Sequence, residues 1–444
     1  MRISLSLLCL LCYASYAQQP FNPIEKSFPL KWKIKIGIAS FKTNVVFNNG
    51  TLIIGSNGSN FMDYNTYDKN SGVYVINRKT GVIIKKIGGE ELGDMDVNGT
   101  LFHNNKLYFG NDNEEFLCTN LDGKVLWRNP ASGDIEHEPA LLSNKNKQYI
   151  VYATESGEVK AVDPETGLKI WNYYTPDFKG WKPGDNRMIF KVKAYFSNTN
   201  SFYIKPLLVD LNMDGVNDLV YVTYDEKIFA INGYDGKLLW RKNYQGLNSM
   251  IANIGTQKEP LIFVTHSVYN SNDIRLNKFD IINRKGNIVK QQIFGSNDYV
   301  SGLNALNIDN GKIMFACRDS IMLIDKVGNY STTSRVILYD YVSISGDLVK
   351  ENRNGYSPIL ANNIFLYKGL KSALVLNQRD YANSNIGFVE IVSIDQGKVL
   401  ERYALPSASE MPPVIDDIDM DGKLDLLISG FDGYLYCYSL NIKK

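Results

Sequence analysis

Two acidic segments carry the clearest chemical signal in the sequence. Asp210 to Asp218 reads DLNMDGVND, and Asp417 to Asp425 reads DIDMDGKLD. Both fit the pattern D-x-[DN]-x-D-G-x-x-D, in which oxygen ligands alternate with other residues and a glycine permits a sharp turn. A loop of this kind curls around a hard cation, and its last carboxylate closes the shell. The chemistry that we predict is therefore structural Ca²⁺ binding rather than catalysis.

The expected side-chain ligands are Asp210, Asn212, Asp214, Asp218, Asp417, Asp419, Asp421 and Asp425. The carbonyl groups of Val216 and Leu424 are further candidates. The alternative is a pair of solvated acidic turns without a metal. A third fragment, Asp94 to Gly99, has Phe102 where the closing carboxylate would stand, so we interpret it as a turn.

Other reactive residues are scarce. With only 3 histidines, a multi-histidine metal enzyme is disfavoured. Beyond the N-terminal segment, Cys118, Cys317 and Cys437 stand in runs of alternating apolar residues, which predicts three buried thiols. One disulfide with one free thiol is the alternative.

A repeated unit supplies the scaffold that positions these residues. Two strand-like runs joined by a polar turn recur, with turn glycines at Gly81, Gly123, Gly167, Gly236, Gly286, Gly328 and Gly397. The intervals between them are 42, 44, 69, 50, 42 and 69 residues. A period in the mid-forties with four short strands per unit is typical of β-propeller blades. The two long intervals indicate insertions near 175–200 and 333–355.

The last unit is incomplete, and the strand KWKIKIG from Lys31 has no unit of its own. We predict that this strand closes the last blade as its outer strand, because closure removes an exposed sheet edge. The fold class is then all-β, a propeller of eight four-stranded blades. Seven blades is the alternative, since the sixth unit is weakly marked.

In a propeller, the loops that lead into the innermost strands form one mouth of the central channel. The candidate ligand-binding residues at this mouth are Glu136, His137, Glu138, Lys205, Tyr356 and Glu410, with Trp181 and Arg187 added by the first insertion. An aromatic and charged rim suits a carbohydrate or a peptide. Solvated rim residues without a ligand are the alternative, and we assign no catalytic residue.

Two units carry a family pattern, AVDPETGLKIW from Ala161 and AINGYDGKLLW from Ala230; a third keeps Gly123 and Trp127. They resemble the tryptophan-docking repeats of quinoprotein (PQQ)-like eight-bladed β-propellers, in which an outer-strand Trp packs into the next blade. The resemblance implies either a dehydrogenase with pyrroloquinoline quinone and Ca²⁺ or a non-catalytic scaffold of outer-membrane assembly or substrate binding. Those dehydrogenases carry adjacent cysteines, and the sequence has no Cys-Cys pair, so we do not expect the quinone.

The acidic segments resemble the calcium loops of FG-GAP repeats, as in integrin-α-like propellers. There the loop joins the first and second strands of a blade. The runs PLLVDL and DLVYVTY flank the first acidic segment, and PPVIDDI and DLLISGF flank the second, which matches that placement.

The N-terminus has the pattern of an export signal. Met1-Arg2 is followed by an apolar core and by Ser15-Tyr16-Ala17, which predicts cleavage after Ala17. Leucines before Cys9 and Cys12 disfavour lipid attachment. We expect a signal peptide at 1–17, a single propeller domain at 18–444, and a secreted, periplasmic or cell-surface location. No later run reaches the ~18 apolar residues of a membrane helix.

Net charge excludes one partner class. Lys and Arg number 48 and Asp and Glu 47, for a formal charge of +1, so we expect no nucleic acid partner. We predict an exported, monomeric, non-enzymatic scaffold that binds a protein or glycan and holds structural Ca²⁺. The alternative is an extracytoplasmic enzyme acting on a carbohydrate or alcohol at the channel mouth, similar to a polysaccharide lyase, a glycosidase or a quinoprotein dehydrogenase.

Overall fold

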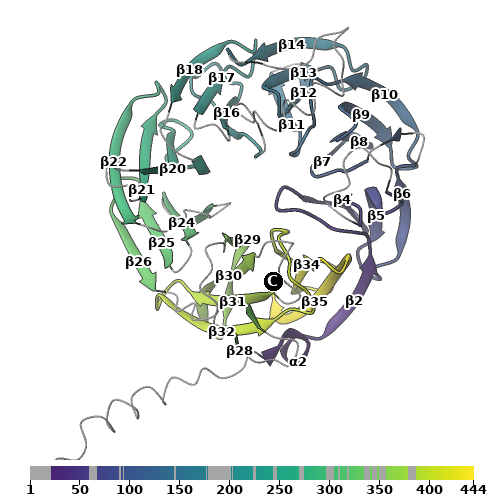
Figure 1. Ribbon diagram of the computed structural model, residues 1–444, viewed down its shortest axis with the longest axis vertical. Coiled ribbons are helices and arrows are strands. Elements are labelled where there is room, and N and C mark those ends of the chain that lie inside the picture. Colours follow the sequence, from purple (N-terminus) through teal and green to yellow (C-terminus); the bar gives the residue numbers. More distant parts are fainter. Residues whose placement is uncertain are drawn as a thin grey trace, which may run out of the picture.

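The computed structural model describes residues 22–444, except 60–67, 90–91, 94, 145–146, 177, 179–201, 203, 224–226, 244–247, 270–274, 297–304, 309–310, 318–319, 335–340, 343–347, 350–356 and 379–386. Within this part of the chain, eight antiparallel sheets follow one another in a closed ring (Figure 1). The predicted eight-bladed propeller is confirmed, and the seven-bladed alternative is wrong because the weakly marked sixth unit forms a blade of its own.

Each blade contains four strands, A to D, from the centre of the ring to its rim. Blades 1 to 4 consist of β3 (Val45–Asn48), β4 (Thr51–Asn57), β5 (Ser71–Asn77) and β6 (Ile83–Ile87); β7 (Thr100–His103), β8 (Lys106–Asn111), β9 (Glu115–Asn120) and β10 (Val125–Pro130); β11 (Ala140–Asn144), β12 (Lys147–Ala153), β13 (Glu158–Val162) and β14 (Lys169–Tyr174); and β15 (Leu207–Val209), β16 (Asp218–Val222), β17 (Lys227–Ile231) and β18 (Leu238–Asn243).

Blades 5 to 8 consist of β19 (Asn248–Asn253), β20 (Leu261–Tyr269), β21 (Arg275–Asn283) and β22 (Ile288–Ser296); β23 (Ala305–Ile308), β24 (Lys312–Cys317), β25 (Ser320–Asp325) and β26 (Tyr330–Ser334); β29 (Ser357–Tyr367), β30 (Leu370–Gln378), β31 (Phe388–Ser393) and β32 (Lys398–Ala404); and β33 (Val414–Asp416), β34 (Lys423–Ser429), β35 (Tyr434–Lys443) and β2 (Leu30–Lys35). A two-stranded sheet, β27 (Tyr341–Val342) with β28 (Leu348–Val349), lies within the second insertion.

The closing strand behaves as the sequence predicts. Strand β2 pairs antiparallel with β35, so that Trp32 stands opposite Cys437, and it is the outer strand of blade 8 (Figure 1). Just before it, β1 (Asn22–Pro23) pairs in parallel with β32 at the rim of blade 7, and the short helix α2 (Ile24–Ser27) follows. Phe28 is buried against Tyr403 with ring centroids 4.9 Å apart. The N-terminal segment therefore holds the last two blades together.

Strand direction sorts the loops onto two faces. Because successive strands of a blade are antiparallel, the A–B and C–D connections lie on one face, which we call the turn face. The B–C loops and the connections into the next strand A lie on the other, which we call the mouth face. Both acidic segments join strands A and B, as predicted from their flanking runs, and so belong to the turn face.

Apolar side chains between neighbouring sheets form the core. Every residue is buried in β16 and in β31, and four of the five residues of β13 are buried. Cys118 and Cys437 are buried and free, as predicted; the side chain of Cys317 lies outside the described part. No helix among the described residues is long and apolar enough to span a membrane.

Docking tryptophans join four pairs of blades. A Cβ added to the turn glycine of the next blade would lie only 2.5 to 2.9 Å from an indole, and each of these glycines has φ between 71° and 81°. The pairs are Trp32–Gly81, Trp127–Gly167, Trp171–Gly236 and Trp240–Gly286. The predicted packing of Trp127, Trp171 and Trp240 into the next blade is confirmed, and Trp32 adds a contact between the last blade and the first.

Candidate functional site

The acidic loop of blade 4 is built around two carboxylates that bind the backbone. Asp210 accepts hydrogen bonds from the N–H groups of Met213, Asp214 and Gly215 at 2.7 to 3.2 Å. Asp218 is fully buried and accepts from Leu211, Asn212 and the C–D turn residue Gly233 at 2.8 to 3.3 Å. Burial raises the pKa of Asp218 to about 6, although these donors favour its ionised form. The remaining predicted ligands, Asn212 and Asp214, are exposed.

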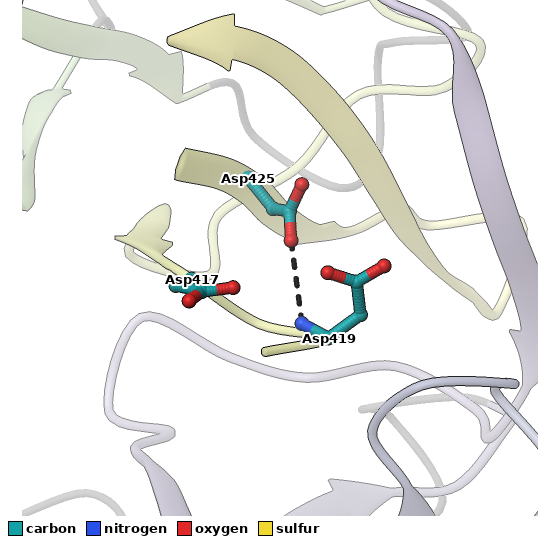
Figure 2. A group of neighbouring side chains, drawn as sticks. All are labelled: Asp417, Asp419 and Asp425. Carbon is teal, nitrogen blue, oxygen red and sulfur yellow. Dashed lines mark hydrogen bonds between the residues drawn. The ribbon is translucent and has the colours of Figure 1, made fainter. Parts of the chain in front are cut away.

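The acidic loop of blade 8 repeats this geometry. Asp417 accepts hydrogen bonds from the N–H groups of Asp421 and Gly422 at 2.9 and 3.0 Å. Asp425 accepts from Ile418 at 3.1 Å and from Asp419 at 3.4 Å (Figure 2). The fourth residue of each loop, Met213 in blade 4 and Met420 in blade 8, has a positive φ of 65° or 62°. The two sequence copies thus fold alike.

Three carboxylates of blade 8 converge. Oxygen atoms of Asp417, Asp419 and Asp425 lie within 4.8 Å of one another, and Figure 2 shows the three side chains around a common space. Such a group has the donor chemistry of a hard-cation site. Burial raises the pKa of Asp425 to about 6 against the opposing effect of Lys31.

A lysine from the closing strand fills part of this group. The Lys31 Nζ lies 2.8 Å from Asp419, 2.9 Å from Asp421 and 2.9 Å from Asp425. Burial opposes the charged form of the amine, but its interactions with these three carboxylates outweigh burial and raise the pKa of Lys31. The ammonium is therefore firmly protonated and stands where a metal would meet the same oxygens.

The two loops differ as calcium sites. Blade 4 offers three carboxylates and the Asn212 amide, and among the described residues no Lys or Arg forms an ion pair with them. This donor set fits Ca²⁺, with Asp210, Asn212, Asp214 and Asp218 as the residues that would hold it. In blade 8, Lys31 already occupies the carboxylate oxygens, so a calcium ion fits there only if the lysine leaves.

On the mouth face, the described residues include charged groups that pair with one another. Glu136, in the loop before β11, is buried and lies 2.5 Å from the Lys42 Nζ. Asn98 donates to the same carboxylate at 2.7 Å, and the Ser40 hydroxyl donates to the Asn98 side-chain oxygen at 2.5 Å. Burial disfavours ionised Glu136, but the Lys42 charge prevails and lowers its pKa. The cluster connects the entry loops of blades 1, 2 and 3.

Glu155, in the β12–β13 loop, completes this cluster and was missed in the sequence. Burial and the neighbouring Glu136 charge raise the pKa of Glu155 well above its usual value, and the two carboxyl groups are hydrogen-bonded. Two carboxyl groups whose pKa values are shifted in opposite directions thus lie together beside the Lys42 ammonium. Lys42 and Glu155 belong to no recognisable motif, so only the folded ring brings them to Glu136.

The other predicted mouth residues have mixed surroundings. His137 is buried and neutral because burial lowers its pKa, and its Nδ1 donates to the Glu138 carbonyl oxygen at 2.9 Å. Glu138 pairs with Lys205 of the next blade at 2.9 Å. Glu410 lies in the loop before β33 and is half-buried. Trp181, Arg187 and Tyr356 lie outside the described residues. The binding role of these residues stays a prediction.

Among the described residues, the large exposed apolar side chains lie on the outer strands and in the loops of the turn face. Leu30, Ile84, Leu126, Tyr174, Leu238, Ile288, Val289 and Ile293 lie on outer strands, Val82, Leu168, Tyr234 and Val327 in C–D turns, and Met213, Leu366 and Met420 at A–B connections. Leu168 and Val327 are the most exposed of the turn residues, at 69% and 64%. All fifteen therefore belong to the rim or the turn face, whereas the sequence pattern predicted the ligand-binding residues at the mouth.

The fold, the repeat and the docking tryptophans define a PQQ-like repeat β-propeller. A family model described as outer membrane protein assembly factor BamB matches residues 69–306, more than half of the chain. The chain belongs to this family.

Individual relatives are distant. Outer membrane protein assembly factor BamB of Shewanella oneidensis is 23% identical over 174 residues, which cover 33% of this chain and 43% of that protein. The chain thus spans less than half the length of this curated relative. Among solved structures, BamB from Moraxella catarrhalis has 12% identity and a TM-score of 0.48, covering 93% of this chain and 99% of that one. Sqt1 of Saccharomyces cerevisiae has 10% identity and a TM-score of 0.47, covering 88% and 81%.

Proposed function

We propose that this propeller is an exported, non-enzymatic scaffold that binds a protein partner outside the cytoplasm, in the assembly of outer-membrane proteins. Family membership supports the class of function, because the family model is described as an assembly factor of that kind. The sequence pattern of residues 1–17 supports export. Mass spectrometry of the exported protein tests the latter: we expect Gln18 as its first residue, and a chain retaining Met1 would contradict export by cleavage.

The exposed apolar side chains are the main reason for proposing a protein partner. Protein interfaces concentrate apolar and aromatic side chains that solvent would otherwise cover. Leu168 and Tyr234 stand in the C–D turns of blades 3 and 4, and Met213 stands at the A–B loop of blade 4. Docking of Trp171 over Gly236 joins these two blades at the C–D turn of blade 4. We place the partner on the turn face of blades 3 and 4.

The mouth face supports this choice by contrast. Among the described residues of this face, Lys42 pairs with Glu136 and Lys205 pairs with Glu138. A glycan needs free polar groups and an exposed aromatic ring, whereas the described mouth residues offer self-paired charges. If no protein copurifies, a glycan partner is the alternative to test.

We further propose that the acidic loop of blade 4 holds one structural Ca²⁺ ion. The carboxylate and amide oxygens alternate along Asp210 to Asp218, and the loop already curls through Asp210 and Asp218 onto its own backbone. Its place at the A–B connection of the turn face gives the ion a stabilising role close to the proposed partner surface.

The test of function is affinity purification of the mature protein from a cell envelope, with variants on each face. We expect a discrete outer-membrane assembly protein to copurify with the wild type and with Lys205→Gln, and to be lost with the double variant Leu168→Ser/Tyr234→Ser. Equal recovery with all three would remove the turn face from the proposal. Loss of the copurifying protein with Lys205→Gln alone would indicate that the partner binds the mouth face.

One observation favours a second candidate, an enzyme acting at the mouth. The Glu136 and Glu155 carboxyl groups are hydrogen-bonded beside Lys42 and have pKa values shifted in opposite directions. Strongly shifted carboxyl groups in close contact occur in acid–base catalysis. A carbohydrate substrate would use such a pair as acid and base. Screening of the purified protein against polysaccharides tests it: turnover that disappears in Glu155→Gln would favour the enzyme, and no turnover would leave the scaffold.

A further inference from the structure

The closing strand carries a lysine where its counterparts carry aliphatic residues. In seven blades the outer strand has a β-bulge one residue before the position of the docking side chain, and the bulged residue of β2 is Lys31, between Leu30 and Trp32. The bulged residues of the other six are Ile84, Leu126, Ile170, Leu239, Val289 and Leu400. A bulge re-aims its side chain, and here it directs an amine toward the acidic loop of the same blade.

The same blade has one more carboxylate than its relative. The third position of the acidic loop is Asp419 in blade 8 and Asn212 in blade 4. Blade 8 therefore has four aspartates in its loop against three in blade 4. Lys423 within the loop and Lys31 from the closing strand offset two of the four negative charges of blade 8, which leaves a net charge of −2, against −3 in blade 4. Blade 4 has Leu239 at the position of Lys31.

The lysine also forms an ion pair where blade 4 has a backbone donor. In blade 4, one oxygen of Asp218 accepts from the backbone N–H of Gly233, in the turn between strands C and D. In blade 8, strands C and D are β35 and β2, which come from opposite ends of the described chain, so no such turn joins them. The corresponding buried residue, Asp425, instead has the Lys31 Nζ 2.9 Å from its oxygen.

Calcium and this ammonium compete for the same oxygens. A Ca²⁺ ion requires six to eight oxygens at about 2.3–2.6 Å. The Lys31 Nζ already lies within 2.9 Å of Asp419, Asp421 and Asp425, so both cations cannot occupy the group together. Arg78 of blade 1 adds positive charge beside the loop and donates to the carbonyl oxygens of Asp417 and Ile418.

We propose that Lys31, and not a metal ion, is the cation of the blade 8 acidic loop, and that it ties the N-terminal closing strand to that loop. The closure of the ring is thereby independent of calcium. Only the comparison with blade 4 rests on the calcium site proposed above; the role of Lys31 stands without it.

The test is calorimetric titration of CaCl₂ into the mature protein from Gln18 and its variants. Asp214→Ala removes a ligand of blade 4 and leaves blade 8 intact. Lys31→Leu/Asp419→Asn gives blade 8 the four predicted side-chain ligands of blade 4 and a leucine at the bulge of its outer strand. In the Asp214→Ala background with Lys31 present, we expect no calcium binding. When Lys31→Leu/Asp419→Asn is added, we expect one calcium ion to bind, with an affinity at least about tenfold above any residual affinity of the Asp214→Ala protein, because a contacting positive charge has been removed. Lys35→Leu, an exposed lysine of the same strand, is the matched control and should gain nothing.

The outcomes separate the two proposals. If the wild type binds no calcium but Lys31→Leu/Asp419→Asn does, the blade 4 site fails and the role of Lys31 stands. If the Asp214→Ala protein binds calcium with Lys31 intact and loses it with Asp425→Asn, the inference is overturned. A folded Lys31→Leu/Asp419→Asn protein that gains no site also overturns it.

A stability measurement covers the case in which Lys31→Leu folds poorly. The ion pair predicts that Lys31→Leu lowers the melting temperature in EDTA. The same change should lower it less in the Asp419→Asn background, because the loop then holds one carboxylate fewer to repel the others. Equal losses in both backgrounds would mean that Lys31 does not act as the cation of the loop.

Discussion

The indole of Trp32 lies over Gly81 of the first blade, and its N–H donates to the Arg78 carbonyl oxygen at 3.1 Å. Trp32 is in the closing strand of the last blade, so this contact joins the two ends of the ring. The same arrangement within the ring links blades 2 to 3, 3 to 4 and 4 to 5. Ring closure thus reuses a contact that the repeat already provides.

Removal of this indole should open the ring at its joint. We expect Trp32→Ala to lower the free energy of unfolding by about 3–5 kcal/mol, the usual cost of deleting a large buried aromatic side chain. Urea unfolding measures it. Lys35→Ala on the same strand should change the free energy by less than about 0.5 kcal/mol, as surface substitutions do. A cost for Trp32→Ala no larger than that of the control would contradict the closing role.

The turn glycines under the indoles are needed for two reasons, their positive φ and the close approach of the indole. A Cβ at Gly236 would lie 2.5 Å from Trp171, and its φ is 73°. Gly369 has a similar φ of 78° with open space around it, so Gly369→Ala reports backbone strain alone. We expect Gly236→Ala to cost about 1–3 kcal/mol more than Gly369→Ala, from overpacking against the indole. Equal costs would mean that the glycine is needed only for its backbone.

The calcium site of blade 4 predicts a metal-dependent melting temperature. A ligand that binds the native state alone stabilises it in proportion to the logarithm of its concentration. We expect saturating Ca²⁺ to raise the melting temperature of the EDTA-treated protein by roughly 3 °C, and to raise that of Asp214→Ala far less. Mg²⁺ at the same concentration is the control for ionic strength. An unchanged melting temperature in Ca²⁺ would reject the site.

Glu155 predicts a defined pH dependence. Its folded-state pKa is well above the usual 4.5, so the folded protein holds a proton that the unfolded chain releases. The stability from this proton is complete below pH 4.5 and decreases as the pH rises toward the folded-state value. Glu155→Gln keeps a neutral hydrogen-bonding group at every pH.

We therefore expect Glu155→Gln to gain stability relative to the wild type as the pH rises from 5 to 8. Urea unfolding of both proteins at these two pH values gives the difference directly. Glu165→Gln, an exposed residue outside the cluster, should show no such trend. A constant difference between Glu155→Gln and wild type would mean that Glu155 is already ionised at pH 5.

The parts of the structure that depend on local pattern could be predicted from the sequence. The acidic loops, the turn glycines and the closing strand KWKIKIG each carry their information within a short segment, and the blades follow from its repetition. Contacts between distant segments left no such signal. Lys31 meets Asp421 across 390 residues, and Glu155 meets Lys42 only because two blades apart in sequence lie together in the ring. The Trp32 contact was missed because its strand has no preceding hairpin turn.

Site-specific crosslinking tests the central claim, that a protein partner binds the turn face, most directly. A photoreactive residue would replace Leu168 or Tyr234 on the turn face, or Lys205 on the mouth face, in the protein exported by its own cell. We predict one discrete crosslinked protein from both turn-face positions and none from Lys205. Crosslinks from Lys205 alone, or from no position, would contradict the account.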